Sequence, residues 1–152
     1  MSISSIFVYG TLKRDQLRGS MWPKRPRSIQ PAIVLGQLWD LGSYPGLCLG
    51  NDPILGELWT FDSKDIPSTL DILDGIEGYD PSSASGLYLR KVIQVRSNDE
   101  QTEAFAYLIE DIGKWPRARR IFPWSDSPSG EQIALWPDSL ARVPEHESDE
   151  DC

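Results

Sequence analysis

Short apolar runs with a period of two, each ended by turn residues, are the feature that most constrains the fold of this chain. Such alternation predicts half-buried β-strands, and clusters of Gly, Pro, Asn and Ser predict the turns between them. Gly36, inside one of these runs, predicts a β-bulge. The expected strands cover residues 3–9, 32–41, 47–50, 54–61, 87–97 and 102–109, with a proline-rich loop at 24–31 and turns at 42–46, 51–53 and 98–101.

One segment has a helical period instead. Ile66, Leu70 and Leu73 fall at positions i, i+4 and i+7, Asp62 or Ser63 can cap the helix, and Gly75 is expected to end it. The segment 13–22 predicts a short helix or a turn that stops at Pro23. Five or six short strands around one clear helix predict an α+β fold, with either a strongly curled sheet or a small mixed β-barrel.

The length of 152 residues predicts a single domain. We expect this domain to cover 1–136, with its core at 3–109 and a Trp- and Pro-rich segment at 110–136 wrapped over it by aromatic anchors. The acidic segment 137–152 is expected to be a disordered, solubilising tail. The basic run at 117–120 is interpreted as a solvated helical face. The anchors of the wrapped segment are Trp115, Phe122, Trp124 and Trp136.

Composition excludes several classes of function. The formal charge is −8, and five of the acids lie in the tail, so no basic surface for nucleic acid is expected. No apolar run is long enough to cross a membrane and no signal sequence is present, which predicts a cytoplasmic protein. Two cysteines and a single histidine, His146, do not suit a metal site or a Ser-His or Cys-His nucleophile. Cys48 is expected to be a small buried hydrophobe.

Two short motifs are candidates for chemistry. In Tyr9-Gly10-Thr11-Leu12, the glycine either ends a strand in a simple turn or lets backbone N–H groups converge on a carboxylate or an oxyanion. Lys13 adds a nearby positive charge or is solvated. Glu77, between Ile76 and Gly78-Tyr79, is either a proton-transfer group whose charge is disfavoured by a helix C-terminus and partial burial, or a loop acid that accepts backbone hydrogen bonds.

The motifs together resemble the γ-glutamylcyclotransferase superfamily, and in particular its AIG2-like and γ-glutamylamine cyclotransferase branch. The resemblance lies in the order Phe-Val-Tyr-Gly-Thr-Leu-Lys (7–13), Gly-Ser-Tyr-Pro-Gly (42–46), Leu-Asp-Gly-Ile-Glu-Gly-Tyr-Asp-Pro (73–81) and Leu-Tyr-Leu-Arg-Lys (87–91). It covers roughly residues 3–109. The co-occurrence of these motifs in this order is much more specific than any of them alone.

The resemblance implies a site and a reaction. The loop Tyr9, Gly10, Thr11 and Leu12 would receive the γ-glutamyl group, and Glu77 would be the catalytic carboxylate. The remaining implied positions are Tyr88 and Tyr44 in the pocket, Tyr107 either in the pocket or in the core, and a structural Arg90. The implied substrate is a small γ-glutamyl amine or amide, cyclised to 5-oxoproline by its own α-amino group. No metal or cofactor is implied, and the leaving amine and the oligomeric state are not predicted.

Alternatives remain at the level of the sequence. A non-catalytic module that binds a γ-glutamyl or related acidic metabolite would use the same pocket, although the presence of Glu77 favours an enzyme. A Ser or Cys hydrolase is disfavoured because the chain has no Gly-x-Ser-x-Gly elbow. The polar stretch 80–86 is either a lid or an insertion, and we favour an insertion. The Trp- and Pro-rich segment has no counterpart in the family motifs.

Overall fold

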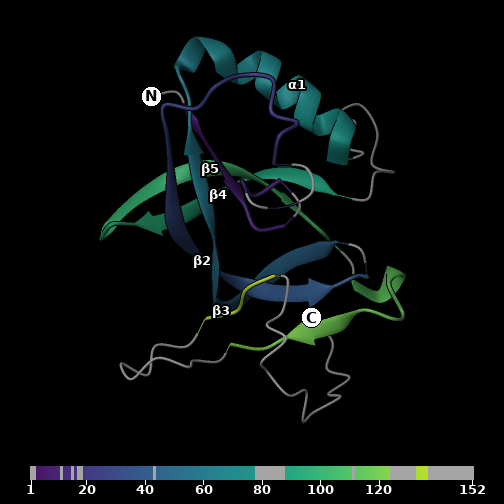
Figure 1. Cartoon of the computed structure of the whole chain (residues 1–152). Helices are drawn as coiled ribbons and strands as arrows, with labels where there is room; N and C mark the ends of the chain where they lie inside the picture. The colour runs from purple at the N-terminus through teal and green to yellow at the C-terminus, as the bar shows by residue number, and fades with distance from the viewer. Residues whose placement is uncertain are drawn as a thin grey trace.

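The computed structural model forms a closed, mixed barrel of five strands (Figure 1). The structure describes residues 3–10, 12–14, 16, 19–42, 44–77, 88–110, 112–123 and 133–136. The strand order is β3-β1-β5-β4-β2, and β2 pairs again with β3 to close the ring. β1 is parallel to β5, and the other barrel pairs are antiparallel. The predicted α+β class is confirmed, as a barrel rather than an open sheet. The barrel strands are β1 (Ser5–Val8), β2 (Ser28–Asp40), β3 (Pro45–Thr60), β4 (Leu89–Ser97) and β5 (Glu100–Leu108).

The long hairpin of β2 and β3 departs from the prediction in two places. β2 begins at Ser28, inside the proline-rich segment that was expected to be a loop, because Pro31 pairs with β3 and its carbonyl accepts a hydrogen bond from the Ser97 hydroxyl (2.9 Å). β3 is one strand rather than two. The Asn-Asp-Pro segment does not end the strand, because residues of β3 on both sides of it pair with β2.

Gly36 marks the predicted bulge. The register shifts between Gly36 and Gln37, so that Gly36 pairs with Asp52 whereas Gln37 pairs with Cys48. A Cβ at Gly36 would lie 2.7 Å from the Cys48 carbonyl oxygen, so the position requires glycine. The bulge prediction is confirmed, and Cys48 is buried as expected.

A tight hairpin joins β4 to β5. Asn98 and Asp99 both have positive φ (53° and 64°), as a two-residue type I′ turn requires, and Asn and Asp tolerate this conformation better than most residues. The turn is therefore shorter than the four residues predicted, since Glu100 and Gln101 already belong to β5.

The helix α1 (Ile66–Glu77) follows a 3₁₀ turn, η1 (Ser63–Asp65), and lies across one side of the barrel (Figure 1). The face predicted from the period is confirmed, because Ile66, Leu70 and Leu73 are buried. The predicted end was wrong. Gly75 is exposed, with nothing within 4 Å of a Cβ placed on it, and the helix continues through it to Glu77. Glu77 is therefore the last helical residue and not a loop acid.

The chain after β5 adds a short 3₁₀ turn, η2 (Ile112–Lys114), and a strand, β6 (Arg119–Ile121), on the side of the barrel away from α1 (Figure 1). β6 pairs with β2, so Arg119 and Arg120 of the basic run lie in a strand and Arg117 in a turn, and the predicted helical face is wrong. The Arg120 guanidinium donates to the Asp52 carboxylate (2.9 Å) and lies over the Phe122 ring.

Residues 133–136 also pack on the barrel. Ala134 pairs with Ile54 in β3, and the Trp136 side chain is buried in the core. The ammonium of Lys13, itself buried, donates to the Trp136 carbonyl (2.5 Å), so Lys13 is not the solvated residue that one alternative expected. Trp124, the segment 80–86 and the tail 137–152 lie outside the described residues.

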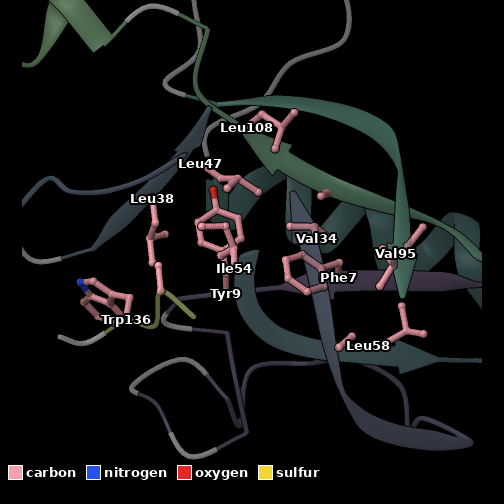
Figure 2. Packing of buried hydrophobic residues seen from close by; sticks show 14 of the residues in the cluster. Phe7, Tyr9, Val34, Leu38, Leu47, Ile54, Leu58, Val95, Leu108 and Trp136 are labelled. Atoms are coloured by element: carbon pink, nitrogen blue, oxygen red, sulfur yellow. The ribbon is translucent and has the colours of Figure 1, made fainter. Parts of the chain in front are cut away.

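Two apolar clusters position the site. One fills the barrel and includes Phe7 and Tyr9 of the first strand segment with Val34 and Leu47 (Figure 2). The other lies between the barrel and α1 and includes Ile6 and Val8 from the opposite face of β1. Because side chains alternate along a strand, β1 contributes to both clusters.

Candidate functional site

Tyr9 is the buried centre of the predicted site. It follows β1, only 6% of its surface is exposed, and its hydroxyl donates to the backbone carbonyl of Tyr107. Burial raises the pKa of Tyr9 well above its ordinary value, and the neighbouring Tyr88 and Glu77 charges raise it further. The Glu77 carboxylate therefore acts electrostatically on a buried hydroxyl at the end of β1, although 68 residues separate them in the chain.

Gly10 is explained by a close contact. A Cβ at this position would lie 2.6 Å from Cγ and 2.8 Å from Cδ of Pro45, the first residue of β3. Among the described glycines a positive φ occurs at Gly42, not at Gly10, so the requirement is for space and not for left-handed backbone. The carbonyl of Pro45 accepts the Tyr88 hydroxyl (2.6 Å). Gly10, Pro45 and Tyr88, which belong to three different sequence motifs, therefore lie together in the fold.

The rest of the first loop turns back on itself. The Lys13 amide donates to the Gly10 carbonyl (3.0 Å), and Leu12 is buried, with its carbonyl accepting the Trp22 indole N–H (3.0 Å). The described part of 13–22 consists of consecutive turns, one of the two outcomes expected there. Thr11, also predicted to bind substrate, lies outside the described residues.

An aromatic cluster extends from this centre toward the surface. Tyr44, at the β2–β3 turn, is half-buried and lies 6.3 Å from the ring of the buried Tyr88. Its other side meets Trp115 edge to face, with ring centres 6.1 Å apart. Trp115 was expected only as an anchor of the wrapped segment. Its contact with Tyr44 brings that segment to the rim of the predicted pocket.

Tyr107 is held by a residue that sequence reasoning did not select. Its hydroxyl donates to Asp74 Oδ1 (2.6 Å), and Arg90 Nη1 donates to Asp74 Oδ2 (2.6 Å). Burial raises the pKa of Tyr107, and the hydrogen bond to Asp74 raises it further. The sequence signal that could have found Asp74 is its position three residues before Glu77, on the same side of a helix.

A cavity of about 440 Å³ lies between β2, β3, β4 and β5. Apolar side chains dominate its wall, with Gln94, Arg96 and Gln101 as the polar members, and none of the predicted site residues lines it. None of the described side chains that line it is a carboxylate, and Glu77 is not among them. Within the described ranges no three His, Cys, Asp or Glu side chains are grouped as a metal site requires, and no helix there could span a membrane.

Comparison with known proteins identifies the family. The model of the γ-glutamyl cyclotransferase, AIG2-like family matches residues 6–126. The chain belongs to this family. The YtfP protein of Escherichia coli K12, named as a γ-glutamylcyclotransferase family protein, is 34% identical over 90 residues, which are 59% of this chain and 71% of YtfP. A Vibrio cholerae protein that carries the name putative γ-glutamylcyclotransferase is 33% identical over 79 residues, which are 47% of this chain and 62% of that protein.

Solved structures show the same fold at lower identity. A mouse AIG2-like protein has a TM-score of 0.56 and 21% identity, over 71% of this chain and 78% of that one. The Arabidopsis thaliana protein At5g39720.1 has a TM-score of 0.52 and 20% identity, over 72% of this chain and 70% of that one. The AIG2-like family and its barrel, both expected from the ordered motifs, are confirmed.

Two of the buried tyrosines, Tyr9 and Tyr107, predict a loss of stability in alkali. Since folding raises the pKa of Tyr9 and of Tyr107, their contribution is complete below about pH 10 and is lost as the pH rises above it toward the folded-state values. We expect the tyrosinate absorbance of these two residues to appear only when the protein unfolds, and Tyr9→Phe to make the alkaline loss less steep. Titration of all five tyrosines near pH 10 in the folded protein would contradict this.

Proposed function

We propose that this protein releases 5-oxoproline and a free amine from a γ-glutamyl amine or amide, with Glu77 as general acid and base. The observation that carries the proposal is the position of Glu77 on the last turn of α1, which Asp74 ties to Tyr107. The Tyr107 carbonyl in turn accepts the hydroxyl of Tyr9, the residue before Gly10. Membership of the AIG2-like γ-glutamyl cyclotransferase family supports the reaction class. The substrate and the roles of individual residues are part of the proposal.

In the proposed reaction the substrate supplies its own nucleophile. Its α-amino nitrogen, after losing a proton to Glu77, attacks the γ-carbonyl carbon and closes a five-membered ring. The C–N bond to the leaving amine then breaks, and Glu77 returns its proton to the departing nitrogen. The ring nitrogen gives up its second proton to the released amine, which leaves as an ammonium ion. Because nucleophile and carbonyl belong to one molecule, orientation supplies much of the rate, and no Ser or Cys nucleophile is needed.

The first loop is proposed to hold the glutamyl end. Backbone amides of Tyr9, Gly10, Thr11 and Leu12 would donate to the substrate's carboxylate or to the oxygen that becomes negative during ring closure. The Lys13 amide is already bonded to the Gly10 carbonyl, which keeps the loop turned. Tyr88 and Tyr44 would line the way out, and Trp115 stands next along the same aromatic cluster.

The experiment is a panel of γ-glutamyl amines and γ-glutamyl amino acids incubated with purified protein, with 5-oxoproline and the freed amine measured by chromatography. We expect at least one member to give both products in equal amounts. Each reactive member is also tested with its α-amino group acetylated. Acetylation removes the nucleophile and should abolish both products.

Two other outcomes have distinct meanings. Amine release from the acetylated compound, with N-acetylglutamate in place of 5-oxoproline, would show hydrolysis and contradict ring closure. Tight binding of a panel member, measured by calorimetry, with no product from any of them would favour the non-catalytic binding module.

A further inference from the structure

We infer that Asp74 is a positioning residue that fixes the last turn of α1, and with it Glu77, against β5. The inference rests on the proposed function of Glu77, because positioning has a catalytic meaning only if Glu77 transfers protons. Its structural part, that Asp74 holds this turn, can be measured without any substrate.

Both oxygens of Asp74 are occupied by fixed donors. The Tyr107 hydroxyl reaches one and the Arg90 guanidinium the other, each at 2.6 Å. The Asp74 side chain is 10% exposed and that of Arg90 is 22% exposed, so water competes little for these bonds. Arg90 also lies over the Phe105 ring (5.7 Å), which limits its own movement. Charge-assisted bonds of this kind are among the stronger ones in proteins.

The same residue of β5 holds the other half of the site. The Tyr107 hydroxyl binds α1 through Asp74, and the Tyr107 backbone carbonyl accepts the hydroxyl of Tyr9. Tyr107 is therefore a common support for the end of β1 and the end of α1. Glu77 follows Asp74 by three residues, which places the two side chains on neighbouring positions of one helix face. Fixing Asp74 therefore fixes the helical turn that carries Glu77.

The last turn of α1 needs such a support. A helix C-terminus has carbonyl groups without helical partners and tends to fray. Gly75 lies inside this turn and is exposed, and among the described residues no atom lies within 4 Å of a Cβ built on it. A glycine in a helix costs about 1 kcal/mol relative to alanine. Stability alone would be served equally well by an apolar side chain at 74, because burying an ion pair gives little net gain. An ion pair with two directed hydrogen bonds gives orientation instead.

The test compares Asp74→Asn and Tyr107→Phe with two control variants on the same helix. Asp71→Asn makes the same change at an exposed position. Thr69→Val removes a buried hydroxyl that donates to the Asp65 carbonyl (2.7 Å) near the start of α1, and so lowers stability without touching the last turn. Hydrogen exchange of the amides at 74–77 is measured by NMR, together with kcat and KM for a reactive γ-glutamyl substrate.

We expect faster amide exchange at 74–77 in Asp74→Asn and Tyr107→Phe, and unchanged exchange at these amides in the two control variants. We expect kcat to fall about 10- to 100-fold in Asp74→Asn with KM little changed, since a displacement of about 1 Å can cost that much. The fall should be smaller in Tyr107→Phe. The double variant should be no slower than Asp74→Asn alone, because both changes break one network.

Three results would overturn the inference or separate it from the proposed function. Unchanged exchange at 74–77 in Asp74→Asn would show that Asp74 does not hold this turn. Faster exchange with unchanged kcat, or an equal loss of kcat in Thr69→Val, would reduce Asp74 to a structural role. If the wild type forms no 5-oxoproline from any substrate, the proposed function fails, and the exchange data alone decide whether Asp74 anchors the helix. If Asp74→Asn does not fold, Tyr107→Phe, which removes one hydroxyl, carries the same test.

Discussion

Replacing Glu77 with glutamine is expected to lower kcat for 5-oxoproline formation by about 10³-fold, within the range that general acid-base catalysis contributes. Glutamine keeps the size and the hydrogen-bonding oxygen of glutamate but cannot accept a proton from the α-ammonium group. Glu77 is the last residue of α1 and is half-buried, so the substitution leaves the helix and both apolar clusters unchanged. Substrate binding should therefore survive, and calorimetry with the unreacted substrate should show it.

The control for this substitution is Glu103→Gln, which neutralises an exposed glutamate of β5 and should leave kcat unchanged. Glu77→Asp keeps the carboxyl group but withdraws it by one methylene, and its kcat should fall between those of the wild type and the glutamine variant. A Glu77→Gln variant within about tenfold of the wild type would place the proton-transfer role on another group, because general acid-base catalysis normally contributes 10²- to 10⁴-fold.

Local periodicity predicted which segments form strands and helices better than it predicted where those elements begin and end. The faces of α1 and the bulge at Gly36 follow from side-chain spacing and from backbone crowding, which are local properties. Where α1 ends depends on contacts made far away in the chain. Gly75 is a helix-ending signal, yet the helix continues through it to Glu77, and Asp74, beside it, binds Tyr107 and Arg90. Tertiary contacts override propensity there.

The site shows the same division between local and distant causes. The ordered motifs led to Glu77, Tyr9 and Tyr88. The charges of Glu77 and Tyr88 both raise the pKa of the buried Tyr9. Asp74 was missed because an acid on a helix has no local sign of burial, and its partners come from β4 and β5. Lys13 posed the same difficulty, because its acceptor, the Trp136 carbonyl, is more than 120 residues away.

Gly10→Ala is expected to destabilise the protein by about 1–3 kcal/mol, the usual cost of forcing extra carbon into a packed site. The new methyl would lie 2.6 Å from Cγ of Pro45, too close for any real contact, so the proline or the loop must move. Movement of Pro45 would also displace the carbonyl that accepts the Tyr88 hydroxyl. Activity should therefore fall together with the free energy of unfolding measured in urea.

Pro45→Ala provides the decisive comparison, because it removes the two ring carbons that the new methyl would meet. The double variant Gly10→Ala, Pro45→Ala should recover most of the stability lost by Gly10→Ala, with a coupling free energy of about 1 kcal/mol or more. Gly75→Ala is the matched control. It makes the same change in open space within a helix and should stabilise the protein by about 0.5–1 kcal/mol. If Gly10→Ala lowers the free energy of unfolding by the same amount in the Pro45 protein and in the Pro45→Ala variant, the contact with Pro45 does not explain Gly10. The requirement for glycine would then lie in the loop that follows.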